Sequence, residues 1–247
     1  MSGAYFVKIY RIAPEPGLDL DSGEPDFAEK LARWYSPPQQ TFVRANLVSS
    51  PSGRLVGSSG DSRSLSNPID RQLVRILRSQ ADAVIVGGHT VRAEPVPVPP
   101  HAPLVILSSR GDLSGHRVSP ASLRPGGVLV ITGSAPDVSP AEFFPQGTAS
   151  HHLLGDQPTI DPSLLQDFLR GEGFQHLLLE GGQLTLTKWL EAGLVDELAL
   201  TLTGPPLFAQ QPPLPWWKEK WGEWKALGVA TDSGKNLYFR FRAPFLP

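Results

Sequence analysis

Three segments place glycine, hydroxyl and charged residues directly after short apolar runs. In an open α/β sheet, ligands bind at the carboxyl ends of the strands, and apolar runs of this length are typical of buried strands. In residues 84–94, Gly87 and Gly88 follow such a run, and Thr90 comes two positions later. Glycines let a ligand approach the backbone closely, and exposed N–H groups favour anions. A tight turn without a ligand explains these glycines equally well.

The second segment, residues 176–198, has Glu180, Gly181 and Gly182 between an apolar run and a helical pattern. A glycine turn that opens a helix aims backbone N–H groups and the positive end of the helix dipole at a phosphate. This arrangement favours an anion site, although the glycines could serve packing alone.

The third segment, residues 103–112, ends its apolar run in Ser108, Ser109 and Arg110. Arginine binds phosphate through two parallel hydrogen bonds, and hydroxyls donate to the same oxygens. These residues suit a phosphate monoester, but an ordinary polar turn has the same composition.

Several other kinds of site are excluded. The chain of 247 residues has no cysteine, which rules out disulfides, thiolate metal sites and cysteine nucleophiles. Its six histidines form no H-E-x-x-H pattern, so we expect no metal site, and the G-x-G-x-x-G, phosphate-loop and G-x-S-x-G motifs are missing. A net charge of −2 argues against nucleic acid as a partner. With no secretory signal and no apolar run long enough to span a bilayer, we expect a cytoplasmic protein that binds no membrane.

The elements that must position these residues alternate between strands and helices. Asn67 and Pro68 are typical of a helix start, and the apolar spacing after them predicts a helix to about residue 81. The fold class expected is α/β, with a mostly parallel sheet flanked by helices and an antiparallel C-terminal hairpin. We expect an N-terminal arm at 1–40 and one domain at 41–247. Strands are predicted at 42–48, 83–86, 104–107, 128–131, 176–179 and 194–202, helices at 161–171 and 182–192, and hairpin strands at 226–231 and 236–242.

Taken together, the segments resemble a known family. VRANLVSSPSGRLVGSSGDSRSLSNPIDRQLVRILRSQADAVIVGGHTVRAE (residues 43–94), LVILSSR, and LLLEGGQLTLTKWLEAGLVDELALTLTGPPL (residues 177–207) are similar to the reductase domain of the riboflavin-specific deaminase/reductase. That domain is a relative of dihydrofolate reductase. The chain looks like the free-standing branch of pyrimidine reductases, with no deaminase domain before it.

The resemblance implies an NADPH-dependent reductase. The family reduces the ribose of 5-amino-6-(5-phosphoribosylamino)uracil by hydride transfer to its C1′ carbon. A homodimer is also implied, for which the tryptophans between Trp216 and Trp224 could serve. The cofactor-binding residues implied are Gly87, Gly88, Thr90, Ser108, Ser109, Arg110, Glu180, Gly181 and Gly182; those for the substrate are Asn46, Ser49, Ser50, Ser66 and Asp70.

The sequence departs from the family in the segment that is implied to bind the substrate. The family usually has S-L-D-G after the first strand, whereas this chain has Ser50-Pro51-Ser52-Gly53, so that Ser52 stands where the aspartate is customary. The catalytic group therefore remains open, with Asp70 as the candidate. Two alternatives follow: reduction of a pterin such as dihydrofolate, or a protein that binds NADPH or another nucleotide with little turnover.

Overall fold

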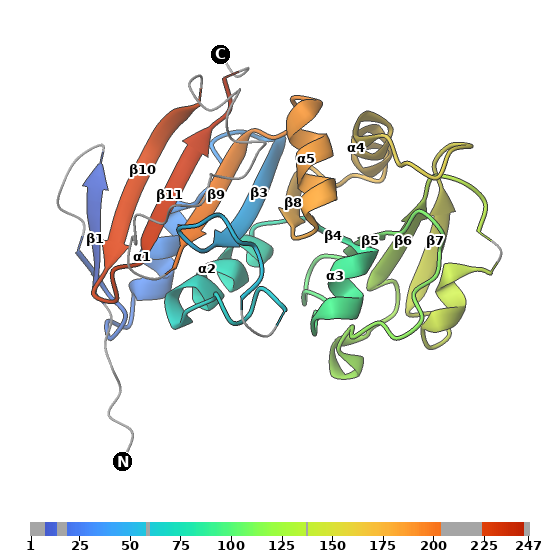
Figure 1. Cartoon of the computed structure of the whole chain (residues 1–247), viewed down its shortest axis with the longest axis horizontal. Helices are drawn as coiled ribbons and strands as arrows, with labels where there is room; N and C mark the ends of the chain where they lie inside the picture. Colours follow the sequence, from blue (N-terminus) through green and yellow to red (C-terminus); the bar gives the residue numbers. More distant parts are fainter. Residues whose placement is uncertain (1–7, 14–18, 58–59, 137, 204–223, 245–247) are drawn as a thin grey trace. The chain divides into compact units, whose positions relative to one another are not determined.

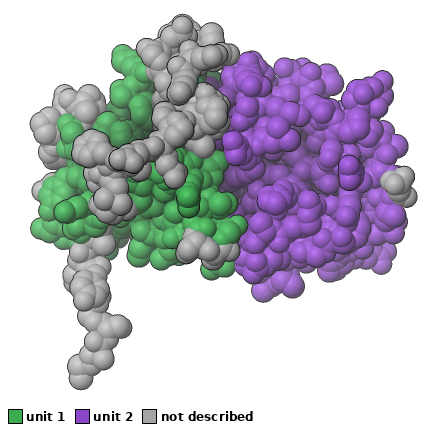
Figure 2. Space-filling model, in the orientation of Figure 1, with its two compact units in different colours: residues 1–36, 46–77, 196–247 green, residues 37–45, 78–195 purple. Residues whose placement is uncertain are grey.

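The computed structural model describes residues 8–13, 19–57, 60–136, 138–203 and 224–244. The chain divides into two compact units (Figure 2). Unit 1 comprises residues 1–36, 46–77 and 196–247, and unit 2 comprises residues 37–45 and 78–195. The chain passes from one to the other within strand β3 (Phe42–Ser49) and within helix α2 (Pro68–Ser79). The sequence-based division into an arm and a single domain stays a prediction.

Unit 2 is built on parallel strands. Strand β4 pairs with β8 on one side and β5 on the other, so that Ile85 lies beside Leu179 and Val105. Every residue of β4 is buried, which explains why its sequence is apolar without alternation. The strands are β4 (Ala83–Gly87), β5 (Leu104–Leu107), β6 (Val128–Thr132), β7 (Ala149–Leu153) and β8 (His176–Glu180), in the order β8-β4-β5-β6-β7 (Figure 1).

The helices of unit 2 follow its strands. Asp161 caps α4 (Pro162–Gly171), because its carboxylate accepts hydrogen bonds from the N–H groups of Ser163 at 2.7 Å and Leu164 at 3.4 Å. Helix α5 (Gln183–Glu191) follows β8, and two short 3-10 turns occupy Pro120–Ser122 and Pro140–Phe143. Helix α3 (Gly88–Ala93) was not predicted, since six residues beginning with glycine carry little helical signal.

Unit 1 contains antiparallel strands. The C-terminal hairpin is confirmed: β10 (Lys225–Asp232) pairs with β11 (Leu237–Arg242). Strand β11 also pairs with β9 (Glu197–Leu202), while β1 (Lys8–Ala13) pairs with β10 and with the three-residue β2 (Asp19–Asp21). The helices are α1 (Phe27–Trp34) and α2, whose predicted start is confirmed by a 2.9 Å hydrogen bond from the Asp70 N–H to Asn67 Oδ1.

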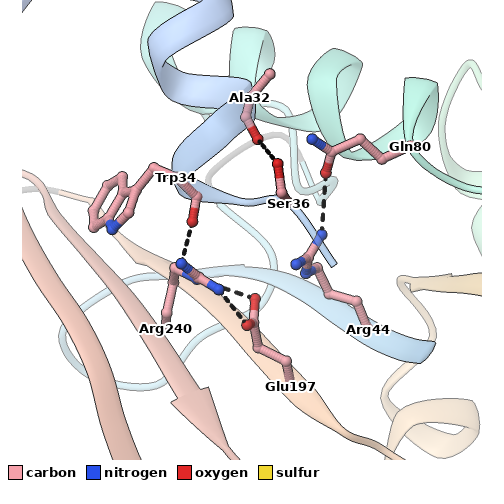
Figure 3. A network of polar contacts seen from close by, with 7 residues as sticks. All are labelled: Ala32, Trp34, Ser36, Arg44, Gln80, Glu197 and Arg240. Atoms are coloured by element: carbon pink, nitrogen blue, oxygen red, sulfur yellow. Dashed lines mark hydrogen bonds and ion pairs between the residues drawn. The ribbon is translucent and has the colours of Figure 1, made fainter. Parts of the chain in front are cut away.

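A buried ion pair ties α1 to the strands of unit 1 (Figure 3). Arg240 on β11 donates to both carboxylate oxygens of Glu197 on β9, at 3.2 and 2.6 Å, and also to the carbonyl of Trp34 at the end of α1. The side chains of Arg240 and Glu197 are only 12% and 1% exposed. The Trp34 ring covers Gly228 on β10, where a β-carbon would lie 3.0 Å from its Cζ2 atom. Helix α1 is therefore packed against the strands of unit 1.

None of the described helices combines the length and apolar character needed to cross a bilayer. Within the same part of the chain, no group of three acidic or histidine side chains could hold a metal ion. The tryptophans from Trp216 to Trp221 lie outside the described residues.

We expect Arg240→Ala to destabilise the protein strongly. Removing one partner of a buried ion pair leaves the other charge uncompensated, and such changes cost about 3–5 kcal/mol. Arg33→Ala is the control, because Arg33 pairs with Glu29 on α1 while the two side chains are 75% and 64% exposed. Urea denaturation should show a large fall in the free energy of unfolding for Arg240→Ala and little change for Arg33→Ala. Equal, small effects would contradict the assigned role of Arg240.

Candidate functional site

The first glycine segment forms a turn between β4 and α3. Gly87 ends the strand with extended backbone, and Gly88 begins the helix. A β-carbon at Gly88 would lie 3.3 Å from the Leu107 carbonyl and 3.5 Å from Ser108 Cβ, so this turn packs against the end of β5. The structure therefore brings the first and third segments together.

The second glycine segment forms the turn between β8 and α5. Gly181 and Gly182 have φ values of +66° and +79°, a region that favours glycine. No side chain of the described residues caps α5, whose first residue is Gln183. The first N–H groups of a helix have no partner within it, so an uncapped start favours an anion.

The two glycine turns are in close contact. A β-carbon at Gly181 would lie 3.2 Å from Thr90 Cγ2, and one at Gly182 would lie 3.7 Å from the backbone of Gly87. From the other side, a β-carbon at Gly87 would lie 3.5 Å from Thr185 Oγ1. Five of the predicted cofactor-binding residues, Gly87, Gly88, Thr90, Gly181 and Gly182, thus lie together in unit 2.

The loop after β5 presents the third segment. Ser108 is buried and its N–H donates to the Ile131 carbonyl at 3.0 Å, whereas Ser109 and Arg110 are exposed. The loop is held from α3, because Arg92 donates to the Asp112 carbonyl at 2.9 Å. An exposed guanidinium on an anchored loop can bind a phosphate from solvent.

Glu180 makes a different contact from the other predicted cofactor residues. Its carboxylate accepts from Arg78 at the end of α2, with distances of 2.8 Å from Nε to Oε1 and 2.6 Å from Nη2 to Oε2. Burial of Arg78 would by itself lower the pKa of its guanidinium, but the Glu180 carboxylate outweighs this and raises the pKa above its usual range. Glu180 is therefore bound within unit 2, and contact with a cofactor stays a prediction.

The predicted substrate residues lie in unit 1. Three of them are serines engaged locally. Ser49 Oγ donates to the Ser50 carbonyl at 2.9 Å, Ser50 Oγ lies 2.9 Å from Ser52 Oγ, and the Ser66 carbonyl accepts from Arg71 at 3.0 Å. Asn46 on β3 differs, because its Oδ1 atom is buried with no hydrogen-bond partner among the residues that the structure describes. Leaving such an atom unpaired is costly, so Asn46 suits a ligand contact.

The candidate Asp70 lies in the first turn of α2 and is 2% exposed. Its backbone N–H is held by Asn67 Oδ1, which lies 3.1 Å from the Tyr238 hydroxyl. That hydroxyl donates to Asp232 at 2.8 Å. Burial, the bond to Asp232 and the nearby charges of Asp232 and Asp70 raise the pKa of Tyr238, so its hydroxyl stays protonated at physiological pH.

The sequence analysis did not identify two buried polar side chains of unit 1 as candidates for the site. Asn67 was predicted only as a helix cap, yet its buried Nδ2 atom finds no partner within the described part of the chain. The same holds for Oγ1 of Thr201, a fully buried residue on β9. For Thr201, the one signal in the sequence was a hydroxyl side chain within an apolar run that predicts a strand.

Comparison with known proteins identifies the family. The profile of the RibD C-terminal domain matches residues 41–212. The chain belongs to the RibD C-terminal domain family. Within the described part of the matched range lie both glycine turns, the Ser108–Arg110 loop and the candidate Asp70.

One relative and two solved structures are similar to this chain. The chain is 27% identical, over 65% of its length and 76% of the relative's, to 2,5-diamino-6-ribosylamino-4(3H)-pyrimidinone 5′-phosphate reductase of Methanothermobacter thermautotrophicus. A pyrimidine reductase-like protein of Corynebacterium diphtheriae shares the fold, with a TM-score of 0.64, 20% identity and coverage of 87% of this chain and 98% of the other. The riboflavin biosynthesis reductase of Saccharomyces cerevisiae gives a TM-score of 0.62 at 15% identity, covering 86% and 97%. The predicted fold class, α/β with a mostly parallel sheet flanked by helices and an antiparallel C-terminal hairpin, is confirmed.

We expect Gly181→Val to weaken NADPH binding by about tenfold or more, equivalent to about 1.4 kcal/mol. The side chain would meet Thr90 and fill space at the turn. Gly173→Val is the control, because Gly173 also has a positive φ, +92°, but a β-carbon there would meet no atom of the described residues within 4 Å. Backbone strain is thus common to both variants, while crowding at the turn belongs to Gly181→Val alone.

Titration of NADPH by nicotinamide fluorescence checks this prediction, with circular dichroism to confirm folding. The control should lose stability and keep its affinity. Unchanged affinity in folded Gly181→Val would remove the turn from the cofactor site.

Proposed function

We propose that the protein is an NADPH-dependent reductase of a pyrimidine ribose phosphate, acting as 5-amino-6-(5-phosphoribosylamino)uracil reductases do. The observation that carries the proposal is the contact between the two glycine turns at the ends of β4 and β8. Membership of the RibD C-terminal domain family supports it, as does the reductase named among the relatives. A homodimer and a cytoplasmic location remain part of the proposal.

The residues of unit 2 fit the cofactor. A β-carbon at Gly87, Gly181 or Gly182 would lie 3.2–3.5 Å from Thr90 or Thr185. The lack of side chains at these glycines would let the backbone approach a diphosphate closely. Thr90 lies beside Gly181, and the exposed Arg110 with Ser109 offers donors for a 2′-phosphate, the group that distinguishes NADPH from NADH. When bound, NADPH supplies the hydride; the protein's task is to bind and orient it.

Unit 1 supplies polar groups that suit a pyrimidine ribose phosphate. Asn46 Oδ1 accepts hydrogen bonds, the Asn67 amide donates them, and the Thr201 hydroxyl does either. A pyrimidine with amino and carbonyl groups matches such a mixture, since each buried group gains a partner on binding. Ser49, Ser50, Ser66 and Asp70, which also lie in unit 1, complete the proposed substrate-binding residues.

One observation favours a second candidate, a nucleotide-binding protein with little turnover. In the ring-opened form of such a substrate, C1′ is the carbon of an imine. Its reduction needs a proton at nitrogen as hydride reaches carbon, and a carboxyl group can provide it. At the position where the family customarily has aspartate, this chain has Ser52, whose hydroxyl instead lies against Ser50. A serine hydroxyl is too weak an acid for that task at neutral pH.

Anaerobic NADPH oxidation tests the proposal. We expect oxidation with 5-amino-6-(5-phosphoribosylamino)uracil or its 2,5-diamino pyrimidinone counterpart, and none with dihydrofolate. Oxidation with dihydrofolate alone would show a pterin reductase. Tight NADPH binding without oxidation in any arm would show a binding protein.

We expect Ser52→Asp to raise kcat with the pyrimidine substrate. General acid catalysis contributes a factor of about 10²–10⁴, so even partial restoration should exceed experimental error. Ser52→Asn is the matched control, since it has nearly the same size without the acidic group. Measuring kcat across pH should show the gain only in the aspartate variant. If wild-type protein already turns over rapidly and Ser52→Asp gains nothing, the missing carboxylate is not limiting.

A further inference from the structure

Arg78 joins three segments of unit 2 that flank the glycine turns. Its guanidinium lies at the end of α2 and binds Glu180, the residue directly before Gly181. Its Nη1 atom also donates to the Pro97 carbonyl at 3.3 Å, in the stretch that follows α3. The Arg78 side chain therefore contacts Glu180, which leads into the Gly181–Gly182 turn, and also the segment that follows α3.

The ion pair is well shielded from water. The side chains of Arg78 and Glu180 are 15% and 12% exposed, and the guanidinium meets both carboxylate oxygens. Paired donors of this kind fix orientation as well as charge, which a lysine ammonium cannot do. The direction in which the chain enters the turn at Gly181 is therefore set in part by Arg78.

The pair also settles an electrostatic conflict at the turn. A diphosphate at Gly181 and Gly182 would bring negative charge next to the Glu180 carboxylate, and like charges repel strongly where water is scarce. Arg78 balances that carboxylate from α2. The other charged group that acts on Arg78 is Glu94, at the end of α3, whose negative charge adds to the need for this cation.

We propose that Arg78 is a positioning residue of the cofactor site, which fixes Glu180 and cancels its charge so that the Gly181–Gly182 turn can accept a diphosphate. This inference rests on the proposed binding of NADPH. It assigns Arg78 no contact with the cofactor. A purely structural role for the pair would affect stability but would not make cofactor affinity respond to the charge of Glu180.

The test compares NADPH affinity in four proteins: wild type, Arg78→Met, Arg78→Lys, and the double variant Arg78→Met with Glu180→Gln. Each is titrated by nicotinamide fluorescence between about pH 5.5 and 8.5, and thermal unfolding is followed in parallel. Because the 2′-phosphate of the cofactor itself titrates near pH 6, each variant is compared with wild type at the same pH.

In Arg78→Met the buried carboxylate loses its cation, so that its charged form is disfavoured. We expect affinity at least about tenfold weaker than wild type at the alkaline end, with the gap closing towards acid as Glu180 takes up a proton. The double variant should lose this pH dependence and recover most of the affinity. Arg78→Lys should fall between wild type and Arg78→Met at alkaline pH, because it keeps the charge without the paired geometry.

The outcomes separate this inference from the proposed function. If wild type does not bind NADPH, both are wrong. A second outcome is that wild type binds NADPH, that Arg78→Met and the double variant have the same affinity as each other, and that neither depends on pH more than wild type does. Arg78 is then only structural, and the proposed function stands. If Arg78→Met does not fold, Arg78→Lys and Glu180→Gln replace it in the test. NADPH affinity equal to that of wild type in both variants would overturn the inference.

Discussion

The contact between the β4 and β8 turns is the constraint on which the candidate site depends. Parallel pairing fixes β4 beside β8, with Ile85 opposite Leu179, so that both strands end at the same edge. The backbones that leave them come so close that a β-carbon at Gly181 would meet Thr90, and one at Gly182 would approach Gly87. The backbone at Gly181 and Gly182 also has positive φ values of +66° and +79°, which favour glycine. The glycines follow from this backbone conformation, and we propose that the lack of side chains lets an anionic ligand approach the turn.

Some buried polar groups of the protein pair with each other, whereas others have no partner among the described residues. In unit 2, Arg78 and Glu180 form a shielded ion pair beside the glycine turns. In unit 1 the pair between Arg240 and Glu197 holds the helix α1 segment, while Asn46, Asn67 and Thr201 keep buried atoms unpaired within the described residues. Such atoms are a disadvantage in a protein that binds nothing, because each forgoes a hydrogen bond available in the unfolded chain. This cost is the reason why we propose that Asn46, Asn67 and Thr201 contact a polar ligand.

Local sequence signals predicted much of the fold. Residues adjacent in the sequence are enough to predict the apolar strands β4, β5 and β6, the start of α2 at Asn67-Pro68, and the terminal hairpin. Contacts between distant positions gave no such signal: Arg78 and Glu180 are 102 positions apart, and Asn67 and Tyr238 are 171 apart. Glu180 could be recognised beside its glycines, but nothing in the sequence showed that Arg78 would bind it. Likewise the three-residue β2 exists only because β1 offers it a partner.

The direct test of the account is to follow the hydride itself. NADPH carrying deuterium at C4 of the nicotinamide, in each of its two stereochemical forms, is incubated with the protein and 5-amino-6-(5-phosphoribosylamino)uracil. The product is then examined by mass spectrometry and NMR. With one of the two forms, we expect a ribityl product that carries deuterium at C1′. Oxidised cofactor with no deuterium in the pyrimidine product, or no reaction with either form, would contradict this expectation.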